Sequence, residues 1–133
     1  MCLYTNHDFR IAESDIQCYK ILYKRKFRFP RAPFMHKLYI RGIKYKIKDL
    51  YAIPTCQSGL YRIREGFHCY TDFFHAKSVL WNMQDSWISG ENLKLYKCVI
   101  PAGSKYYIGD KLLTLNENHM VVSNSIIIKH EIT

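Results

Sequence analysis

Short runs of β-branched and aromatic residues, separated by turn-forming residues, recur along this chain and constrain its fold more than any other feature. They cover residues 16–23, 60–64, 93–100, 105–108, 111–115, 120–122 and 126–132. Residues 37–48 also alternate, with Ile43, Tyr45 and Ile47 on one side and lysines between them, as in a strand with one buried face. The runs predict a strand-rich domain.

One segment, "YTDFFHAKSVLWNM" at residues 70–83, has the periodicity of a helix instead. Its apolar residues repeat at helical spacing, at Phe73, Ala76, Leu80 and Met83. Thr71 is the predicted N-cap, Asp72 suits the first turn, and the helix is expected to end before Gly90. The 133 residues therefore predict a single α+β domain, in which one main helix packs on a mostly antiparallel sheet.

The basic residues are concentrated in one part of the sequence. Residues 16–48 contain eleven lysines and arginines and no acidic residue, whereas residues 49–133 contain eight residues of each sign. The net charge of +9 is therefore a regional property, and a basic region raises the local concentration of anions. We interpret it as one anion-facing side of the protein, because so many unopposed charges exceed what solubility needs.

Arginine forks donate paired hydrogen bonds to phosphate oxygens, and aromatic rings stack on bases. The predicted ligand-binding residues are Arg25, Arg28, Arg31, Arg41, Lys44, Lys46, Arg62 and Arg64 for charge, and Tyr39, Phe67 and Tyr107 for stacking. The alternative interpretation is that the aromatic residues belong to the core and the charges form a solvated face. The order of the strands decides between these interpretations, because it determines which basic residues converge.

The segment "CVIPAGSKYYIG" at residues 98–109 contains a distinctive turn. Pro101, Ala102 and Gly103 are predicted to reverse the chain between two strands, and a hairpin with packed tyrosines is the simpler interpretation. The functional alternative places Lys105, with Tyr106 or Tyr107, in the lining of a ligand pocket.

Other chemistry has little support in the sequence. His68 and Cys69 are adjacent, so on a strand they would point to opposite faces and could not share a proton. No close Cys or His pairs suggest zinc, and no glycine-rich phosphate loop is present, so neither catalytic residues nor metal ligands nor a cofactor are predicted.

The cysteines and the hydropathy bear on location. Five cysteines without a CxxC pair or an export signal predict free thiols in the cytoplasm. No window approaches eighteen apolar residues, so no membrane association is expected.

Two segments together, "EGFHCYTDFFHAKSVLW" and "YKCVIPAGSKYYIG", resemble small proteins of gut Bacteroidales and their phages. These proteins pair a Gly-Phe-His strand that enters a short helix with a strand that ends in Ile-Pro-x-Gly. The resemblance covers residues 65–109, about a third of the chain, and it implies no function. A phage protein that sequesters a nucleotide-derived signal would have a basic, aromatic side like the one predicted above.

The same order of elements is similar to the middle of ADP-ribosyltransferase-like folds. The matching positions are Arg41, Gly66, Phe67 and Ala76. This resemblance implies that Arg41 grips the phosphates of a dinucleotide and that a late glutamate stabilises an oxocarbenium-like transition state. Glu117 and Glu131 are the late glutamates, and Glu131 is assigned that role.

Three functions follow as hypotheses. The first is a non-catalytic binding protein for a phosphate-bearing anion, either a nucleotide or nucleotide-derived signal, or single-stranded nucleic acid. The second is an interaction protein that docks on an acidic protein surface. The third is a degenerate ADP-ribosyltransferase-like enzyme that uses Arg41 and Glu131.

Overall fold

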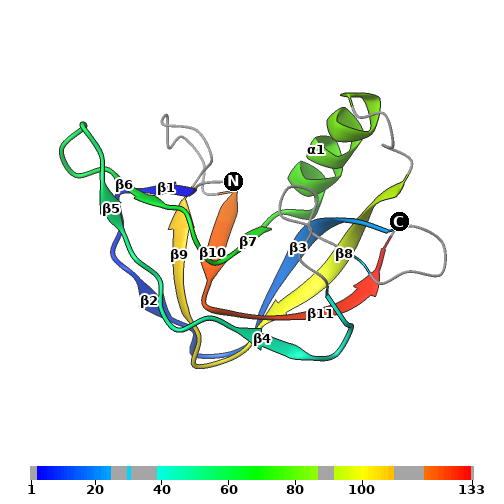
Figure 1. The fold of residues 1–133 in the computed structure, drawn as a ribbon, viewed down its shortest axis with the longest axis horizontal. Coiled ribbons are helices and arrows are strands. Elements are labelled where there is room, and N and C mark those ends of the chain that lie inside the picture. Colours follow the sequence, from blue (N-terminus) through cyan, green and yellow to red (C-terminus); the bar gives the residue numbers. More distant parts are fainter. Residues whose placement is uncertain (1–2, 25–29, 31–38, 87–91, 110–118, 133) are drawn as a thin grey trace.

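The computed structural model describes residues 3–24, 30, 39–86, 92–109 and 119–132, which form one helix and two antiparallel sheets (Figure 1). The elements are β1 (Leu3–Thr5), β2 (Arg10–Ile11), β3 (Ile16–Tyr23), β4 (Lys44–Lys46), β5 (Ile53–Pro54), β6 (Tyr61–Ile63), β7 (Phe67–Tyr70), α1 (Phe73–Ser86), β8 (Leu93–Ile100), β9 (Lys105–Gly109), β10 (Met120–Ser123) and β11 (Ser125–Glu131). The predicted α+β architecture is confirmed.

The larger sheet is built from a few long, bent strands. Arg10 lies opposite Tyr106, and Ile16 lies opposite Ile100. The segment from β2 to β3 and the segment from β8 to β9 therefore have the same length between these two pairs, and the register is kept. The two pairs therefore form one antiparallel ladder with a bend in its middle. Similarly, only Asn124 separates β10 from β11, and these two pair with β9 and β8 respectively.

These long strands close into a ring. The strand order is β2-β9-β10-β7-β3-β8-β11-β4. Three long strands form most of the ring: β2 with β3, β8 with β9, and β10 with β11. Strand β7 closes it, because β7 pairs with β10 on one side and with β3 on the other. The join between β7 and β3 is narrow, since the paired residues there are Tyr19 and Tyr70 alone among the described residues. A small barrel results, with β4 added outside the ring on β11.

The turn at Pro101, Ala102 and Gly103 corrects a prediction. It was expected to reverse the chain into a hairpin, but β8 and β9 do not pair with each other. Instead β9 pairs with β2 and β8 pairs with β3. The backbone of Ala12 explains this, because its carbonyl accepts from Gly103 N at 2.7 Å and its N–H donates to Ser104 O at 2.9 Å. Gly103 has a φ of +86°, which suits glycine, and the turn bends the ladder.

The inner face of the ring carries one of two hydrophobic clusters. Its buried residues are Cys18, Leu22, Tyr39, Phe67, Cys69, Tyr96, Cys98, Ile100, Val121, Ile126 and Ile128. Apart from Tyr39, which precedes β4, they come from β3, β7, β8, β10 and β11 and alternate with residues that point outward, as strand geometry requires. The inside of the barrel is therefore filled by side chains.

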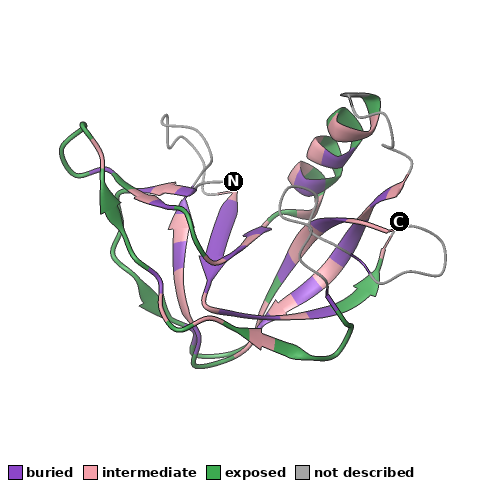
Figure 2. Cartoon of the chain, viewed as in Figure 1, coloured by how far each residue is buried: buried purple, intermediate pink, exposed green. Residues whose placement is uncertain are grey.

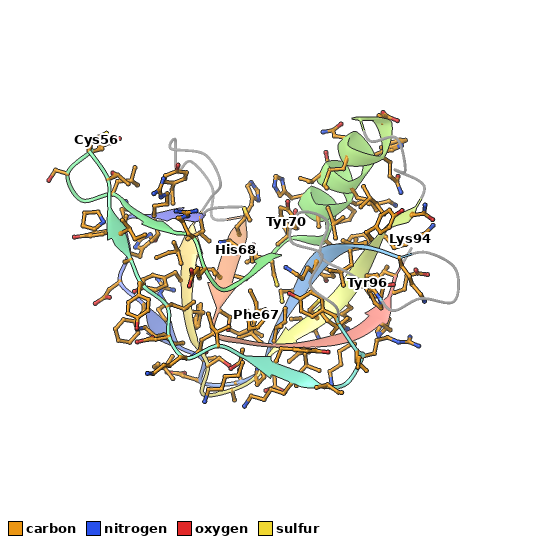
Figure 3. All side chains as sticks on the ribbon, in the orientation of Figure 1. Cys56, Phe67, His68, Tyr70, Lys94 and Tyr96 are labelled. Atoms are coloured by element: carbon orange, nitrogen blue, oxygen red, sulfur yellow. The ribbon has the colours of Figure 1, made fainter. Side chains whose placement is uncertain are left out.

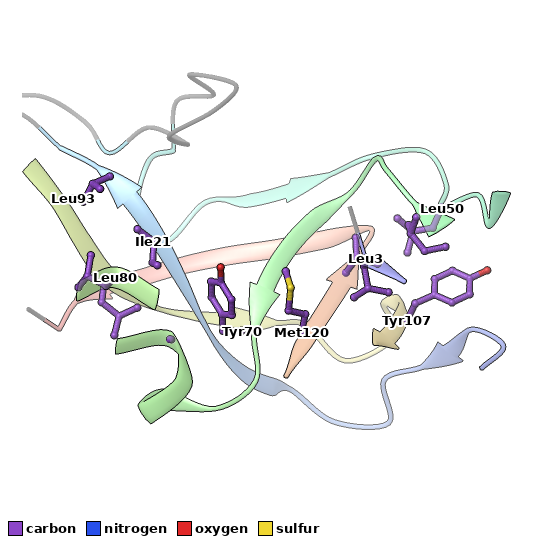
Figure 4. Close-up of a cluster of buried hydrophobic side chains, with 12 residues drawn as sticks. Leu3, Ile21, Leu50, Tyr70, Leu80, Leu93, Tyr107 and Met120 are labelled. Atoms are coloured by element: carbon purple, nitrogen blue, oxygen red, sulfur yellow. The ribbon is translucent and has the colours of Figure 1, made fainter. Parts of the chain in front are cut away.

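The second cluster lies on the outer face, where other elements cover the sheet (Figure 4). Helix α1 packs on β3 and β8, with Ala76 and Leu80 buried, and the small sheet β1-β6-β5 lies beside β9 and β10. The N-cap of α1 is Asp72 and not Thr71, because Asp72 Oδ2 accepts from His75 N at 2.9 Å. Part of the outer face of β4, β8 and β11 remains exposed or half-buried (Figure 2).

Several predicted strands are confirmed, and others are shorter than expected. Residues 16–23 and 93–100 are strands over those same bounds. Residues 37–48 were predicted as one strand, but within their described part, residues 39–48, only Lys44–Lys46 forms a strand. Ile43 is 47% exposed, although it was expected to be buried. The predicted strand at residues 111–115 lies outside the described residues.

Candidate functional site

The predicted ligand-binding residues differ in burial, in their contacts and in their position in the fold. Arg25, Arg28 and Arg31 lie outside the described residues, as does Glu117. The other predicted residues are described, and they do not form one site.

The three aromatic residues expected to stack on a ligand are part of the core, which corrects that prediction. Tyr39, Phe67 and Tyr107 are 3%, 2% and 5% exposed. Tyr39 packs edge to face against Phe67, with ring centroids 6.4 Å apart. Burial also raises the pKa of the Tyr39 hydroxyl well above its usual value. These rings fill the barrel and its outer cover, so their faces are not accessible to a base.

Lys105 is engaged within the protein. Its Nζ lies 3.0 Å from Oδ1 of Asp49 and 4.3 Å from the ring centroid of Phe9. The hydrogen bond from Lys105, together with that from the backbone of Leu50, lowers the pKa of Asp49. Asp49 is the single acidic residue between residues 19 and 51, and it neutralises a lysine outside that segment. Lys105 therefore holds the chain after β4 against β9.

Arg62 and Arg64 lie apart from the lysines of β4. Arg62 belongs to β6, and Arg64 follows that strand, in the smaller sheet β1-β6-β5. Lys44 and Lys46 belong to the edge strand of the larger sheet. Figure 1 shows β6 at the upper left of the molecule and β4 at its lower edge. The arginine pair and the lysine pair therefore do not converge.

A different set of basic residues does converge, on the outer face of β4, β11 and β8. Lys44 lies opposite Ile127, which lies opposite Val99, so the three side chains form a row across the strands. Lys97 lies opposite His130 in the adjacent row. We call this surface the lysine face and define it as Gln17, Lys44, Lys46, Lys97, Val99, Ile127 and His130.

The lysine face is accessible and carries positive charge over an apolar floor. Lys44, Lys46 and His130 are exposed, and Val99 and Ile127 are half-buried. Strands β3, β4, β8 and β11 contain one acidic residue, Glu131, which lies opposite Tyr96 on the inner side. The face therefore lacks a carboxylate from any of its own strands.

Sequence reasoning missed Lys97 and His130 as members of this surface. The alternation of β8 in "LKLYKCVI" does place Lys97 on the side opposite Tyr96 and Cys98. However, only the strand order shows that this side of β8 adjoins β11 and then β4. The pairing of strands distant in the sequence thus creates the surface.

Arg41 and Glu131, the two residues of the ADP-ribosyltransferase-like hypothesis, both approach Tyr96. Glu131 lies opposite Tyr96 in the β8–β11 pair. Burial and the charge of Glu131 raise the pKa of Tyr96 to about 12, while the charge of Arg41 opposes that change. Both charged residues are exposed, and Tyr96 is 1% exposed.

His68 and Cys69 point to opposite sides of β7, as expected for neighbours on a strand. The His68 ring nitrogens lie 3.1 Å from Gly66 O and 3.2 Å from Ile63 O, whereas Cys69 belongs to the inner cluster. Burial lowers the pKa of His68 to about 4. Within the described residues, no group of His, Cys, Asp and Glu side chains has the arrangement of a metal site.

Neither the helix nor the comparisons with known proteins assign a role to the chain. Among the described residues, no helix is long and apolar enough to cross a membrane. Comparisons of the chain with protein-family models, with curated proteins and with solved structures found no match.

Proposed function

We propose that this chain is a non-catalytic binding protein for phosphate-bearing anions and that the lysine face is its binding surface. The observation that carries the proposal is the convergence of Lys44, Lys46 and Lys97 on one uncovered face whose strands supply no carboxylate to it. Ammonium groups over a half-buried apolar floor suit a ligand with alternating phosphates and planar bases.

Protection of the sheet edge is the competing explanation for part of this surface. Natural proteins place lysines on edge strands to prevent pairing with other chains, and β4 is an edge strand. This explanation covers Lys44 and Lys46. It does not cover Lys97, because β8 pairs on both sides, with β3 and β11. A cation at a central position favours a role in binding.

An extended ligand suits this surface better than an enclosed nucleotide. The aromatic residues that would have sandwiched a single base, Tyr39, Phe67 and Tyr107, are buried in the core. The lysines instead lie across three adjacent strands, which are about 4.8 Å apart in any sheet. We therefore propose single-stranded nucleic acid as the ligand. A nucleotide-derived signal is the small-molecule source of the same phosphate chemistry.

The test is a salt titration of binding to a fluorescent oligothymidylate of about 15 nucleotides, followed by anisotropy. Each phosphate contact to a single strand contributes about 0.7 to the slope of log affinity against log salt. The double variant Lys44→Gln/Lys46→Gln should lower that slope by about 1.4 and weaken binding about tenfold at low salt. Arg62→Gln/Arg64→Gln is the matched two-charge control, because Arg62 lies on β6 and Arg64 follows it in the smaller sheet, apart from the lysine face.

The outcomes separate the possible ligands. Equal losses in the double variant and in two-charge controls elsewhere would show a diffuse charge effect and would overturn the lysine face as the site. Saturable binding of a cyclic dinucleotide or nucleoside triphosphate, without binding of the oligonucleotide, would show a nucleotide site instead. Binding of neither, with stable capture by an acidic protein, would overturn the proposal in favour of the docking function.

The approach of Arg41 and Glu131 to Tyr96 favours one second candidate, the ADP-ribosyltransferase-like enzyme. In that case Glu131→Gln should abolish transfer of label from NAD to proteins of a lysate, while Lys97→Gln should leave the transfer intact. No transfer by the unaltered protein would remove this candidate.

A further inference from the structure

Three of the cysteines meet on the inner face of the barrel. Cys18, Cys69 and Cys98 come from β3, β7 and β8, and each is at most 1% exposed. Cys18 lies between the other two, because β3 lies between β7 and β8 and Cys18 is directly opposite Cys98. The fourth described cysteine, Cys56, is exposed in the loop after β5, and Figure 3 shows it apart from the labelled residues of β7. All four are free thiols.

The strand register gives Cys18 and Cys98 the spacing of a disulfide. The two residues lie directly opposite each other in the β3–β8 ladder. In the same register Ala12 N donates to Ser104 O and Lys24 N donates to Asn92 O, so even-numbered positions of β3 are hydrogen-bonded pairs. Such pairs have Cα atoms about 5.5 Å apart, which is within the range of disulfides.

Lys20 supplies a positive charge beside the thiols. It is the next inward-pointing residue of β3 after Cys18, and its Nζ donates to the carbonyl oxygen of His68 at 2.7 Å. Burial raises the pKa of the Cys69 thiol, but the neighbouring Cys18 thiol and the charge of Lys20 outweigh burial and lower it. A thiolate is the reactive form of cysteine, so Cys69 is the best nucleophile of the three.

We propose that Cys18, Cys69 and Cys98 form a redox site in which Cys18 is the shared partner of one interior disulfide. The oxidant is a small-molecule disulfide such as oxidised glutathione. Cys69 attacks it and releases one glutathione thiolate, and Cys18 then attacks the Cys69 sulfur and releases the second. Exchange with Cys98 moves the bond to Cys18–Cys98. Two protein thiols are oxidised, and one glutathione disulfide is reduced to two thiols.

The narrow join in the barrel supplies a route for the oxidant. Cys18 and Cys69 flank the junction of β3 with β7, where Tyr19 and Tyr70 form the single described pair. Local opening requires less free energy where few backbone hydrogen bonds must break. The site is therefore expected to react slowly but without unfolding, and more slowly than Cys56 by about 100-fold or more.

The experiment uses the full chain with Cys2→Ser and Cys56→Ser, incubated in glutathione buffers, alkylated and mapped by mass spectrometry. The expected product is a peptide that joins Cys18 to Cys98, formed while far-ultraviolet circular dichroism stays unchanged. Alanine variants supply the decisive pattern. Cys18→Ala should abolish the interior disulfide, Cys98→Ala should leave Cys18–Cys69, and Cys69→Ala should leave Cys18–Cys98, formed more slowly.

The mapping of the chain with all three interior cysteines answers the question even where an alanine variant fails to fold. A linked peptide that contains Cys18 supports the proposal. Glutathione adducts alone, a Cys69–Cys98 link, or a disulfide that forms only in denaturant would overturn it. None of these outcomes depends on anion binding, so the redox site stands or fails separately from the lysine face.

Discussion

Polar side chains on the covered parts of the sheet differ in hydrogen bonding and charge from those on the uncovered lysine face. On the inner face, Lys20 donates to the carbonyl of His68, and under β6 the ring of His68 is held mainly uncharged by burial. On the lysine face, Lys97 and His130 lie opposite each other, and their strands place no carboxylate beside them. Where the sheet is covered, a basic side chain is hydrogen-bonded within the protein or held uncharged. Where the sheet is uncovered, the basic side chains have no carboxylate from the neighbouring strands.

Strand β8 shows this contrast within a few residues. Tyr96 and Cys98 are buried on its inner side, while Lys97 and Val99 alternate with them and are half-buried on its outer side. The sequence pattern is the same along the strand. The difference arises because α1 covers only part of the outer side of β8. Coverage by neighbouring elements, more than local composition, decides which charges remain available to a ligand.

The largest effect is expected from truncation of the inner face. Phe67→Ala should lower the free energy of unfolding by about 3–5 kcal/mol, because it leaves a cavity in the barrel beside Tyr39. Chemical denaturation measures this change. The folded fraction should bind an oligonucleotide with unchanged affinity, since Phe67 does not reach the lysine face.

Retained stability with a loss of binding would reverse that assignment. It would show that Phe67 contacts the ligand and that the inner face opens to admit it. Phe67→Leu is the matched control, because it keeps most of the apolar volume and removes only the aromatic ring.

The second effect is a dependence of stability on pH at His68. Its pKa is about 4 in the folded state, against about 6.5 unfolded, so the unfolded chain binds a proton first as the pH falls. The stabilisation is complete above pH 6.5 and is lost as the pH falls towards 4, by about 3 kcal/mol. In denaturation series, His68→Gln should remove this part of the pH dependence.

The two carbonyls that flank His68 favour its charged form and so oppose burial, which is the larger effect on its pKa. The neutral imidazole carries one N–H, so it donates to either Gly66 O or Ile63 O in a given tautomer. Identical acid profiles for the His68→Gln variant and the unaltered chain would mean that the ring titrates normally and that β6 does not bury it.

The elements with strong local patterns could be predicted from the sequence. Residues 16–23 and 93–100 have long β-prone runs, and the helix has its apolar repeat, so periodicity alone identified them. The short strands β1, β2 and β5 were missed because two or three residues carry no periodic signal. Thr71 and Asp72 are both good caps, and only the hydrogen bond to His75 distinguishes them.

The candidate site could be predicted only in part. Lys44 and Lys46 were identified, because their alternation with Tyr45 shows locally which way they point. Their partner Lys97 was not identified, because it is brought beside them by pairings between strands far apart in the sequence. Tyr39, Phe67 and Tyr107 were misassigned for a related reason. Aromatic residues near basic ones suit both a core and a binding surface, and only burial separates the two.

The smallest effect offers the sharpest comparison, because it concerns two lysines of the same strand. Lys97 points to the lysine face, and Lys94, opposite Leu22, points to the inner side near Tyr96 (Figure 3). Lys97→Gln should reduce the salt slope of oligonucleotide binding by about 0.7, with stability changed by less than about 0.5 kcal/mol. Lys94→Gln removes the same charge and should leave the slope unaltered. Equal slopes in both variants would mean that overall charge attracts the ligand, whereas a change confined to Lys97→Gln would fix the ligand on the uncovered side of β8.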